Sequence, residues 1–368
     1  MLPQVLSGQD TISWKSKLKF EADFRFRVEQ DWDSRKSDGS YRPDRTRLRY
    51  RLRAGFTFHH SKYLSFGARL RTGAPNKQQD PQLTLGESYK EFGTLPIGFE
   101  KAYLSFKRYG LEVWAGKNTF PFEKQNELFW SDNVFPEGVF LGYHKKLKKT
   151  PVGKLGLNLG HFLISASGRS LDQDNYLQGA QLLVQGRNDR WALYPGFYYF
   201  NDMPNIPDGF ETYRLNYRIA HLGGIVQPLK KIPLKLTVDG YYNFEDYQGY
   251  DSIPNTLSDQ KSGFVIGLIY GKVKHKKDWL IQVTYARLEQ YSIVDIMAQN
   301  DWARWDYSAY GSPDGRLTNY QGIESTVSYM VNERLKLTTK YYWVNQLVPY
   351  GTHLETNQRI RFDIDIKI

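Results

Sequence analysis

The chain has 368 residues, enough for two or three ordinary domains or for one large β-architecture. It lacks cysteine, which excludes disulfides, thiol catalysis and thiolate metal sites, and no apolar run approaches the ~18 residues of a membrane helix. The net charge of +11 indicates nucleic acid, an anionic membrane surface or small anionic solutes as partners.

The first residues show neither the basic stretch nor the apolar core of a signal peptide. We therefore expect residues 1–11 to be an N-terminal extension, and an exported form to have lost its signal peptide before this start. A β-type alternation begins soon afterwards, between residues 13 and 30. There Phe20 and Phe24 alternate with charged residues that include Arg25 and Arg27.

The next expected strand, near 45–58, has an arginine at every second position. Since successive side chains of a strand point to opposite faces, these arginines form one cationic column. The column consists of Arg45, Arg47, Arg49, Arg51 and Arg53. A soluble sheet would leave the column in bulk water, whereas a membrane barrel would turn the opposite, apolar face to lipid and line its lumen with the arginines.

The same alternation predicts sixteen strands in all. They lie near 13–30, 45–58, 62–73, 99–107, 110–118, 137–146, 153–168, 177–187, 190–201, 212–227, 232–246, 260–273, 278–290, 319–331, 335–347 and 357–368. Several exceed the ~5–6 residues usual in globular sheets and are long enough to cross a bilayer at a tilt.

The links between these strands are alternately short and long. This rhythm is typical of bacterial membrane barrels, which have short periplasmic turns and long outer loops. Soluble β-sandwiches also alternate, but their turns are more evenly short. The last strand alternates up to Ile368 and can close a barrel against the first. We predict an all-β fold, a single transmembrane antiparallel β-barrel over residues 12–368 with about sixteen strands, eighteen being the alternative.

Short motifs between residues 45 and 145 support this prediction. They are 69–73 (RLRTG), 80–86 (DPQLTLG), 100–104 (EKAYL), 115–117 (AGK), 118–122 (NTFPF), 128–132 (LFWSD) and 136–139 (PEGV). Their order resembles the putative porins of Gram-negative outer membranes, a family related in style to phosphate-selective porins. The resemblance implies passive diffusion through a barrel of sixteen or eighteen strands. Glu100 departs from the family pattern, in which aspartate is expected.

The long link near 119–136 follows the fifth strand, where general porins fold a loop inward. It carries Glu123, Lys124, Glu127 and Asp132. We expect it to fold into the barrel and to narrow the channel, so that its charges and a basic wall create a transverse field. The alternative is a surface loop whose aromatic residues hold it to the rim.

The predicted wall combines the arginine column with basic residues of neighbouring strands. The expected pore-lining set is Arg25, Arg27, Arg45, Arg47, Arg49, Arg51, Arg53, Arg69, Arg71 and Lys101. Arginine stays protonated and binds carboxylate or phosphate through two hydrogen bonds, which favours an anion-preferring lumen. In the alternative interpretation, carboxylates neutralise the wall in an ion-pair lattice. The candidates are Glu21, Asp23, Asp363 and Asp365.

Aromatic residues suggest two further roles. In the link near 291–318, Trp302, Trp305, Tyr307 and Tyr310 are expected to pack the loop over the barrel mouth, with stacking on sugars as the alternative. Five tryptophans at strand ends are expected to form interfacial girdles. They are Trp14, Trp114, Trp191, Trp279 and Trp343.

Catalytic signatures are missing, so we predict that the protein is not an enzyme and holds no cofactor or metal. The sequence favours a porin through which small hydrophilic solutes diffuse, with anions preferred because of the basic wall. We expect it to be a multi-pass protein of the Gram-negative outer membrane. The alternatives are a channel specific for an acidic oligosaccharide and a non-conducting structural or assembly barrel. Expected partners are outer-membrane lipid, lipopolysaccharide and small anionic or hydrophilic solutes, with a homotrimer or other envelope proteins as further candidates and no nucleic acid.

Overall fold

The computed structural model describes residues 17–75, 79, 81–86, 92–148, 150–204, 214–251, 253–305 and 318–368. These residues form a closed antiparallel β-barrel of sixteen strands, with one short strand outside the closure. Barrel strands pair with their neighbours along the chain, and the last strand, β17 (Thr356–Lys367), pairs with the first, β1 (Leu18–Trp32). Closure on β1 removes the exposed sheet edges that would otherwise need covering.

The strands are long and follow one another with few interruptions. Between β1 and β17 they are β2 (Arg45–His59), β3 (Leu64–Thr72), β4 (Leu83–Thr84), β5 (Ile97–Arg108), β6 (Leu111–Lys117), β7 (Glu137–Lys146), β8 (Val152–Ser165), β9 (Asn175–Gly186), β10 (Trp191–Pro204), β11 (Arg214–Val226), β12 (Leu234–Asn243), β13 (Ser262–Gly271), β14 (Trp279–Leu288), β15 (Tyr320–Met330) and β16 (Leu335–Gln346). In the part of the chain that the structure describes, the helical elements are single turns, namely η2 (Leu171–Gln173), α2 (Asn255–Ser258) and η3 (Asp295–Met297).

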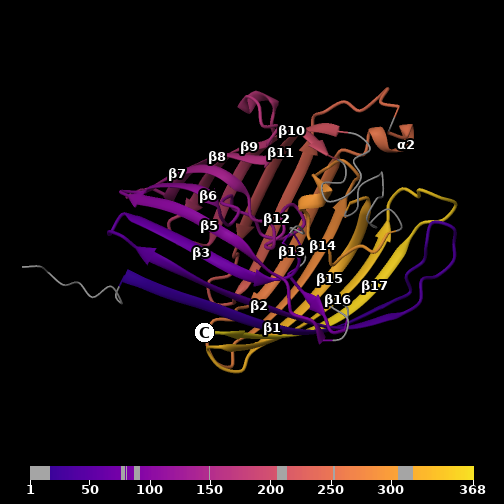
Figure 1. Ribbon diagram of the computed structural model, residues 1–368, viewed down its shortest axis with the longest axis horizontal. Helices are drawn as coiled ribbons and strands as arrows, with labels where there is room; N and C mark the ends of the chain where they lie inside the picture. Colours follow the sequence, from indigo (N-terminus) through magenta and orange to yellow (C-terminus); the bar gives the residue numbers. More distant parts are fainter. Residues whose placement is uncertain are drawn as a thin grey trace, which may run out of the picture.

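The predicted fold class is confirmed, and each of the sixteen expected strands corresponds to one barrel strand within a few residues. The added strand, β4, pairs with β2 outside the closure and is too short for a period-two pattern to reveal. The extension 1–11 and the start of the first expected strand lie outside the described residues. Figure 1 shows the C-terminus and α2, which belongs to a long loop, at opposite ends of the barrel.

The two faces of the wall differ in chemistry. On β2, Leu48 and Leu52 are 42% and 48% exposed on the outside, while Arg49 and Arg51 between them are buried on the inside. This is the apolar-out, polar-in alternation of a barrel that faces lipid. Among the described residues, no helix is long and apolar enough to span a membrane.

Gly116 in β6 illustrates how the wall depends on local backbone geometry. Its φ is +109°, and a Cβ at this position would lie 2.4 Å from the carbonyl oxygen of Ala102 on β5. A side chain would therefore meet both backbone strain and a clash with a strand that cannot easily move. The need for glycine here explains one position of the 115–117 motif.

We expect Gly116→Ala to lower the free energy of unfolding by about 1–3 kcal/mol. The measurement is urea unfolding of the detergent-solubilised barrel, followed by the gel mobility of folded and unfolded forms. Gly240→Ala is the matched control, because the nearest heavy atom to its Cβ, the carbonyl oxygen of Leu222, is 4.0 Å away. Equal effects of the two substitutions would contradict the explanation.

Candidate functional site: the lumen wall and two inward segments

The arginine column of β2 lies inside the barrel, opposite carboxylates of β1. The strand register aligns Glu29 with Arg47 and Asp31 with Arg45, so both sets project from the same face. The resulting ion pairs are Arg45–Asp31 at 2.8 Å, Arg47–Glu29, Arg49–Glu29 at 3.6 Å and Arg51–Asp23. These four arginines are therefore all paired, but three carboxylates of β1 balance their charge only in part.

The closing strand supplies a second row of carboxylates. The Nε atom of Arg25 lies 2.6 Å from Asp365, and that of Arg27 lies 2.6 Å from Asp363. On the other side of β2, Arg69 lies 3.6 Å from Glu21. The ion-pair lattice inferred from the sequence is present, and it extends further than expected because Glu29 and Asp31 also belong to it.

A β-bulge in β5 places two adjacent charged residues inside the barrel. Arg69 pairs with Lys101 and Leu70 with Phe99, so Glu100 is the extra residue between them. Phe99 is 67% exposed on the outside, whereas Glu100 is buried, and the Lys101 ammonium lies 5.3 Å from the ring centre of the buried Phe135. A strict period of two from Phe99 would have turned Lys101 towards lipid.

Glu100 is the principal anion of this region, and the sequence did not indicate that role. Its carboxylate lies 2.8 Å from Arg53 and 2.5 Å from Arg69, with Arg71 at 4.0 Å. The motif around Glu100 marks the position but not its three cationic neighbours, because they come from β2 and β3.

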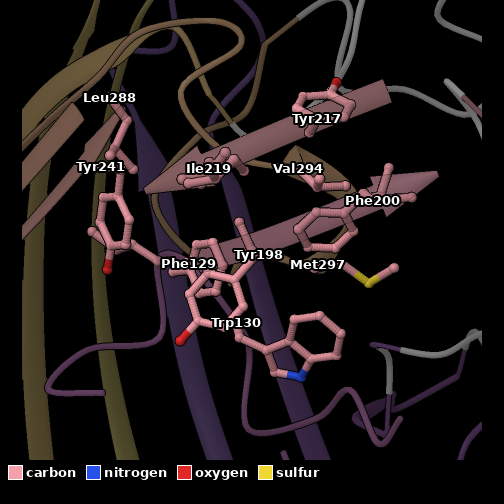
Figure 2. Packing of buried hydrophobic residues seen from close by; sticks show 14 of the residues in the cluster. Phe129, Trp130, Tyr198, Phe200, Tyr217, Ile219, Tyr241, Leu288, Val294 and Met297 are labelled. Carbon is pink, nitrogen blue, oxygen red and sulfur yellow. The ribbon is translucent and has the colours of Figure 1, made fainter. Parts of the chain in front are cut away.

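Segment 119–136 lies inside the barrel. Phe129 stacks on Tyr241 of the wall with ring centres 5.2 Å apart, and Trp130 is buried beside Phe120. Asn126 donates a hydrogen bond of 2.7 Å to Asp239 on β12. Figure 2 shows Phe129 and Trp130 packed together with wall tyrosines such as Tyr198 and Tyr241. A surface loop held only at the rim does not have these contacts.

A second segment, residues 291–305, also enters the barrel and contacts the first. The N–H of Ser131 donates to the carbonyl of Met297 at 2.7 Å, and the N–H of Gln299 to that of Glu127 at 2.9 Å. Trp302 and Trp305 are almost fully buried, so these indoles pack within the barrel instead of presenting a stacking platform. Tyr307 and Tyr310 lie outside the described residues.

Asp301 ties this second segment to the arginine wall. It pairs with Arg361, with Arg27 at 3.5 Å and with Arg359 at 3.6 Å. Burial raises the pKa of the Asp301 carboxyl, but the charges of the arginines, that of Arg361 foremost, outweigh burial and hold this pKa well below its usual range. The ion pairs of Asp301 therefore stabilise the folded protein fully above the ordinary pKa of aspartate. This stabilisation is lost only as the pH falls through the lowered pKa of Asp301.

The charged tip of segment 119–136 borders a cavity of about 470 Å³. Across this cavity stand Gln282 and Thr284 of β14, Glu324 of β15 and Lys340 of β16. The tip contributes Glu123, Lys124, Glu127 and Asp132. It faces β14–β16, whereas we expected it to face the arginine column.

Two of the carboxylates at this cavity are paired. Lys124 lies 2.6 Å from Asp132, and Lys340 lies 2.7 Å from Glu324. Glu123 and Glu127 have no such ammonium partner among the described residues, so the cavity lining carries an excess of negative charge.

The expected aromatic girdle is only partly present. Trp279 and Trp343 are 55% and 47% exposed on the barrel exterior, and Trp191 is half-buried at the start of β10. For Trp114 the prediction is wrong, because it is buried in the lumen and stacks on Phe162 with ring centres 5.6 Å apart. Trp114 lies on the inward face of β6, so its indole cannot reach the membrane interface. Trp14 lies outside the described residues.

The described residues contain no group of three His, Asp or Glu side chains placed to hold a metal ion. Buried His221 contacts Asp239 at 2.9 Å but also stacks on Tyr241, which makes it part of the packing under Phe129. The site as a whole consists of a paired basic wall, two inward segments and a charged cavity between them.

Several solved porin structures share this architecture. The chain aligns with OprB of Pseudomonas putida at 13% identity and a TM-score of 0.58, covering 96% of this chain and 95% of OprB. For OmpF of Salmonella typhi in complex with daunomycin the identity is 12%, the TM-score 0.54 and the coverage 97% and 99%. For a mutant of the Rhodopseudomonas blastica porin the identity is 10% and the TM-score 0.54, covering 95% of this chain and 100% of that porin. At such identities the similarity establishes the fold.

A comparison with protein-family models finds one matching family. Residues 39–202 match the putative porin family. The resemblance inferred from the motifs is thereby confirmed, without extending to a phosphate-selective class. No curated protein matches the chain.

The part that matches the putative porin family contains much of the site. It includes the arginine column, Glu100 and the whole of segment 119–136, whereas the segment with Asp301 lies beyond it. Together, the family match and the shared fold point to a porin channel rather than an enzyme.

Proposed function

We propose that the protein is a porin of the Gram-negative outer membrane through which small hydrophilic solutes diffuse passively. The observation that carries this proposal is a closed barrel with an apolar exterior and a charged interior that still holds an open cavity of about 470 Å³. In this proposal residues 12–368 are one domain, lipid and lipopolysaccharide surround it, and segment 119–136 forms the constriction.

The preferred charge of the solute depends on two opposing features. More cations than carboxylates share the wall of β1, β2, β3 and β17, which supports the predicted anion preference. The cavity beside segment 119–136 has the opposite excess, because Glu123 and Glu127 lack ammonium partners among the described residues. We retain the anion preference as part of the proposal, carried by the wall.

The test is the reversal potential of single channels in a planar bilayer under a KCl gradient. We expect the wild type to prefer chloride, and Arg49→Ala/Arg51→Ala to shift the reversal potential towards potassium because two wall charges are lost. Glu123→Gln/Glu127→Gln is the matched double variant and should shift it towards chloride. A wild type that prefers potassium would end the anion preference and leave the porin function intact.

A non-conducting structural or assembly barrel is the second candidate. The supporting observation is that segments 119–136 and 291–305 both occupy the lumen and are hydrogen-bonded to each other. A folded wild-type barrel that gives no conductance would favour this candidate. The channel for an acidic oligosaccharide draws on the same basic wall, and block of the current by micromolar oligogalacturonate would favour it.

A further inference from the structure

The short turns of the barrel carry basic residues that the proposed channel does not use. These turns join β2 to β3, β5 to β6 and so on to β15 and β16, all at one end. In their described residues, Lys and Arg clearly outnumber Asp and Glu. The densest are turn 227–233, with Lys230 and Lys231, and turn 272–278, with Lys272, Lys274, Lys276 and Lys277. We call these two turns the basic rim.

The long loops at the other end have the opposite composition. The loop between β12 and β13, for example, contains Glu245, Asp246, Asp251 and Asp259 against Lys261. Of the two ends of the barrel, the turn end therefore carries the positive excess, and a general excess of lysine does not explain the basic rim.

The lysines of the basic rim are free to bind an external anion. All six side chains are exposed, and among the described residues none has a carboxylate within ion-pair distance. The nearest acid in sequence, Asp278, accepts hydrogen bonds from the backbone N–H groups of Lys274 at 2.9 Å and His275 at 2.8 Å. The Asp278 carboxylate thus stabilises the backbone conformation of the turn and, within the described part of the chain, pairs with none of the lysine ammonium groups.

Exposed apolar side chains flank these lysines. Leu229 and Ile232 are 46% and 45% exposed on either side of Lys230 and Lys231. Trp279, which follows turn 272–278, is 55% exposed and packs on Tyr329 with ring centres 4.6 Å apart. An aromatic or aliphatic group beside a lysine is typical of the boundary between hydrocarbon and headgroups, where the long stem lies in the apolar layer and the ammonium reaches the phosphates.

We propose that the basic rim binds the phosphate groups of anionic phospholipids in the leaflet around the turn end of the barrel. Charge complementarity supports an anionic ligand, since polybasic segments gain roughly fivefold in affinity per lysine at an anionic lipid surface. The exposed apolar flanks favour a lipid over a soluble acidic polymer. The inference rests on the proposed membrane location but not on conduction.

The test measures how much phosphatidylglycerol and how much phosphatidylcholine the purified full chain retains in zwitterionic detergent. Native mass spectrometry at low salt gives both amounts for the wild type and for the variants. We expect the wild type to retain phosphatidylglycerol in preference to phosphatidylcholine. Lys274→Gln/Lys276→Gln/Lys277→Gln should weaken this retention by roughly two orders of magnitude. The control Lys36→Gln/Arg169→Gln/Lys261→Gln removes the same charge from the long loops and should leave it unchanged.

Equal retention of the two lipids by the wild type would overturn the proposal, as would equal losses in both triple variants. Displacement of phosphatidylglycerol by polyglutamate at matched charge would assign the basic rim to an acidic polymer and also overturn it. Planar-bilayer conductance of the same samples separates the two hypotheses. Normal conductance without a lipid preference would overturn only the lipid-binding proposal. A lipid preference without conductance would overturn only the proposed channel function.

Discussion

Glu100→Gln should destabilise the barrel by about 3–5 kcal/mol, the usual cost of removing one partner from a buried ion pair. Glu100 is buried and neutralises Arg53 and Arg69, with Arg71 close by. Glutamine keeps the shape of the side chain but leaves these guanidinium groups repelling one another. Urea unfolding in detergent, followed by gel mobility, measures the difference.

The matched control for this prediction is Glu112→Gln. Glu112 pairs with Lys107 at 2.7 Å, but the Lys107 side chain is 62% exposed, so water screens the pair. Exposed pairs of this kind contribute about 0–1 kcal/mol. If Glu100→Gln unfolds at the same urea concentration as the control, Glu100 is not the anchor of this wall.

Asp301→Asn should release segment 291–305 from the wall, at a cost of about 3–5 kcal/mol to its docking. The substitution removes the carboxylate shared by Arg27, Arg359 and Arg361. We expect higher single-channel conductance, a reversal potential shifted towards chloride, and faster proteolysis within the segment. The first two follow because lumen volume and uncompensated arginine charge both increase.

Asp38→Asn is the control for charge alone. Asp38 is an exposed loop residue whose carboxylate accepts hydrogen bonds from Ser40 in the same loop. Its removal should change neither conductance nor proteolysis. An Asp301→Asn channel with wild-type conductance and selectivity would show that the segment is held by its apolar packing alone.

The strands could be predicted because their alternation is local. Each strand needs an outward apolar face and an inward polar face, so the pattern is written in consecutive residues such as those of 45–53. The paired arginines could be anticipated for the same reason, since Asp363 and Asp365 alternate on the closing strand. The prediction that Lys101 faces the lumen holds only because the β-bulge at Glu100 shifts the inward–outward alternation of β5 by one residue.

Contacts between distant parts of the chain could not be predicted in this way. Asp301 meets Arg27 and Arg361 only after the barrel has closed, and nothing near Asp301 in sequence marks it as their partner. Trp114 shows the same limit, because its position near a strand end indicates a girdle until its inward phase is known. The charged residues of 119–136 were recognisable, but the wall that they face depends on how the segment crosses the lumen.

The backbone hydrogen bonds between the two inward segments have a consequence for pore engineering. Ser131 donates to Met297, and Gln299 donates to Glu127, so each segment satisfies polar groups of the other. Shortening only one loop to widen the passage would leave backbone groups of its partner unsatisfied inside the protein, which is costly. A wider variant must therefore redesign both loops together, although more than 150 residues separate them in the chain.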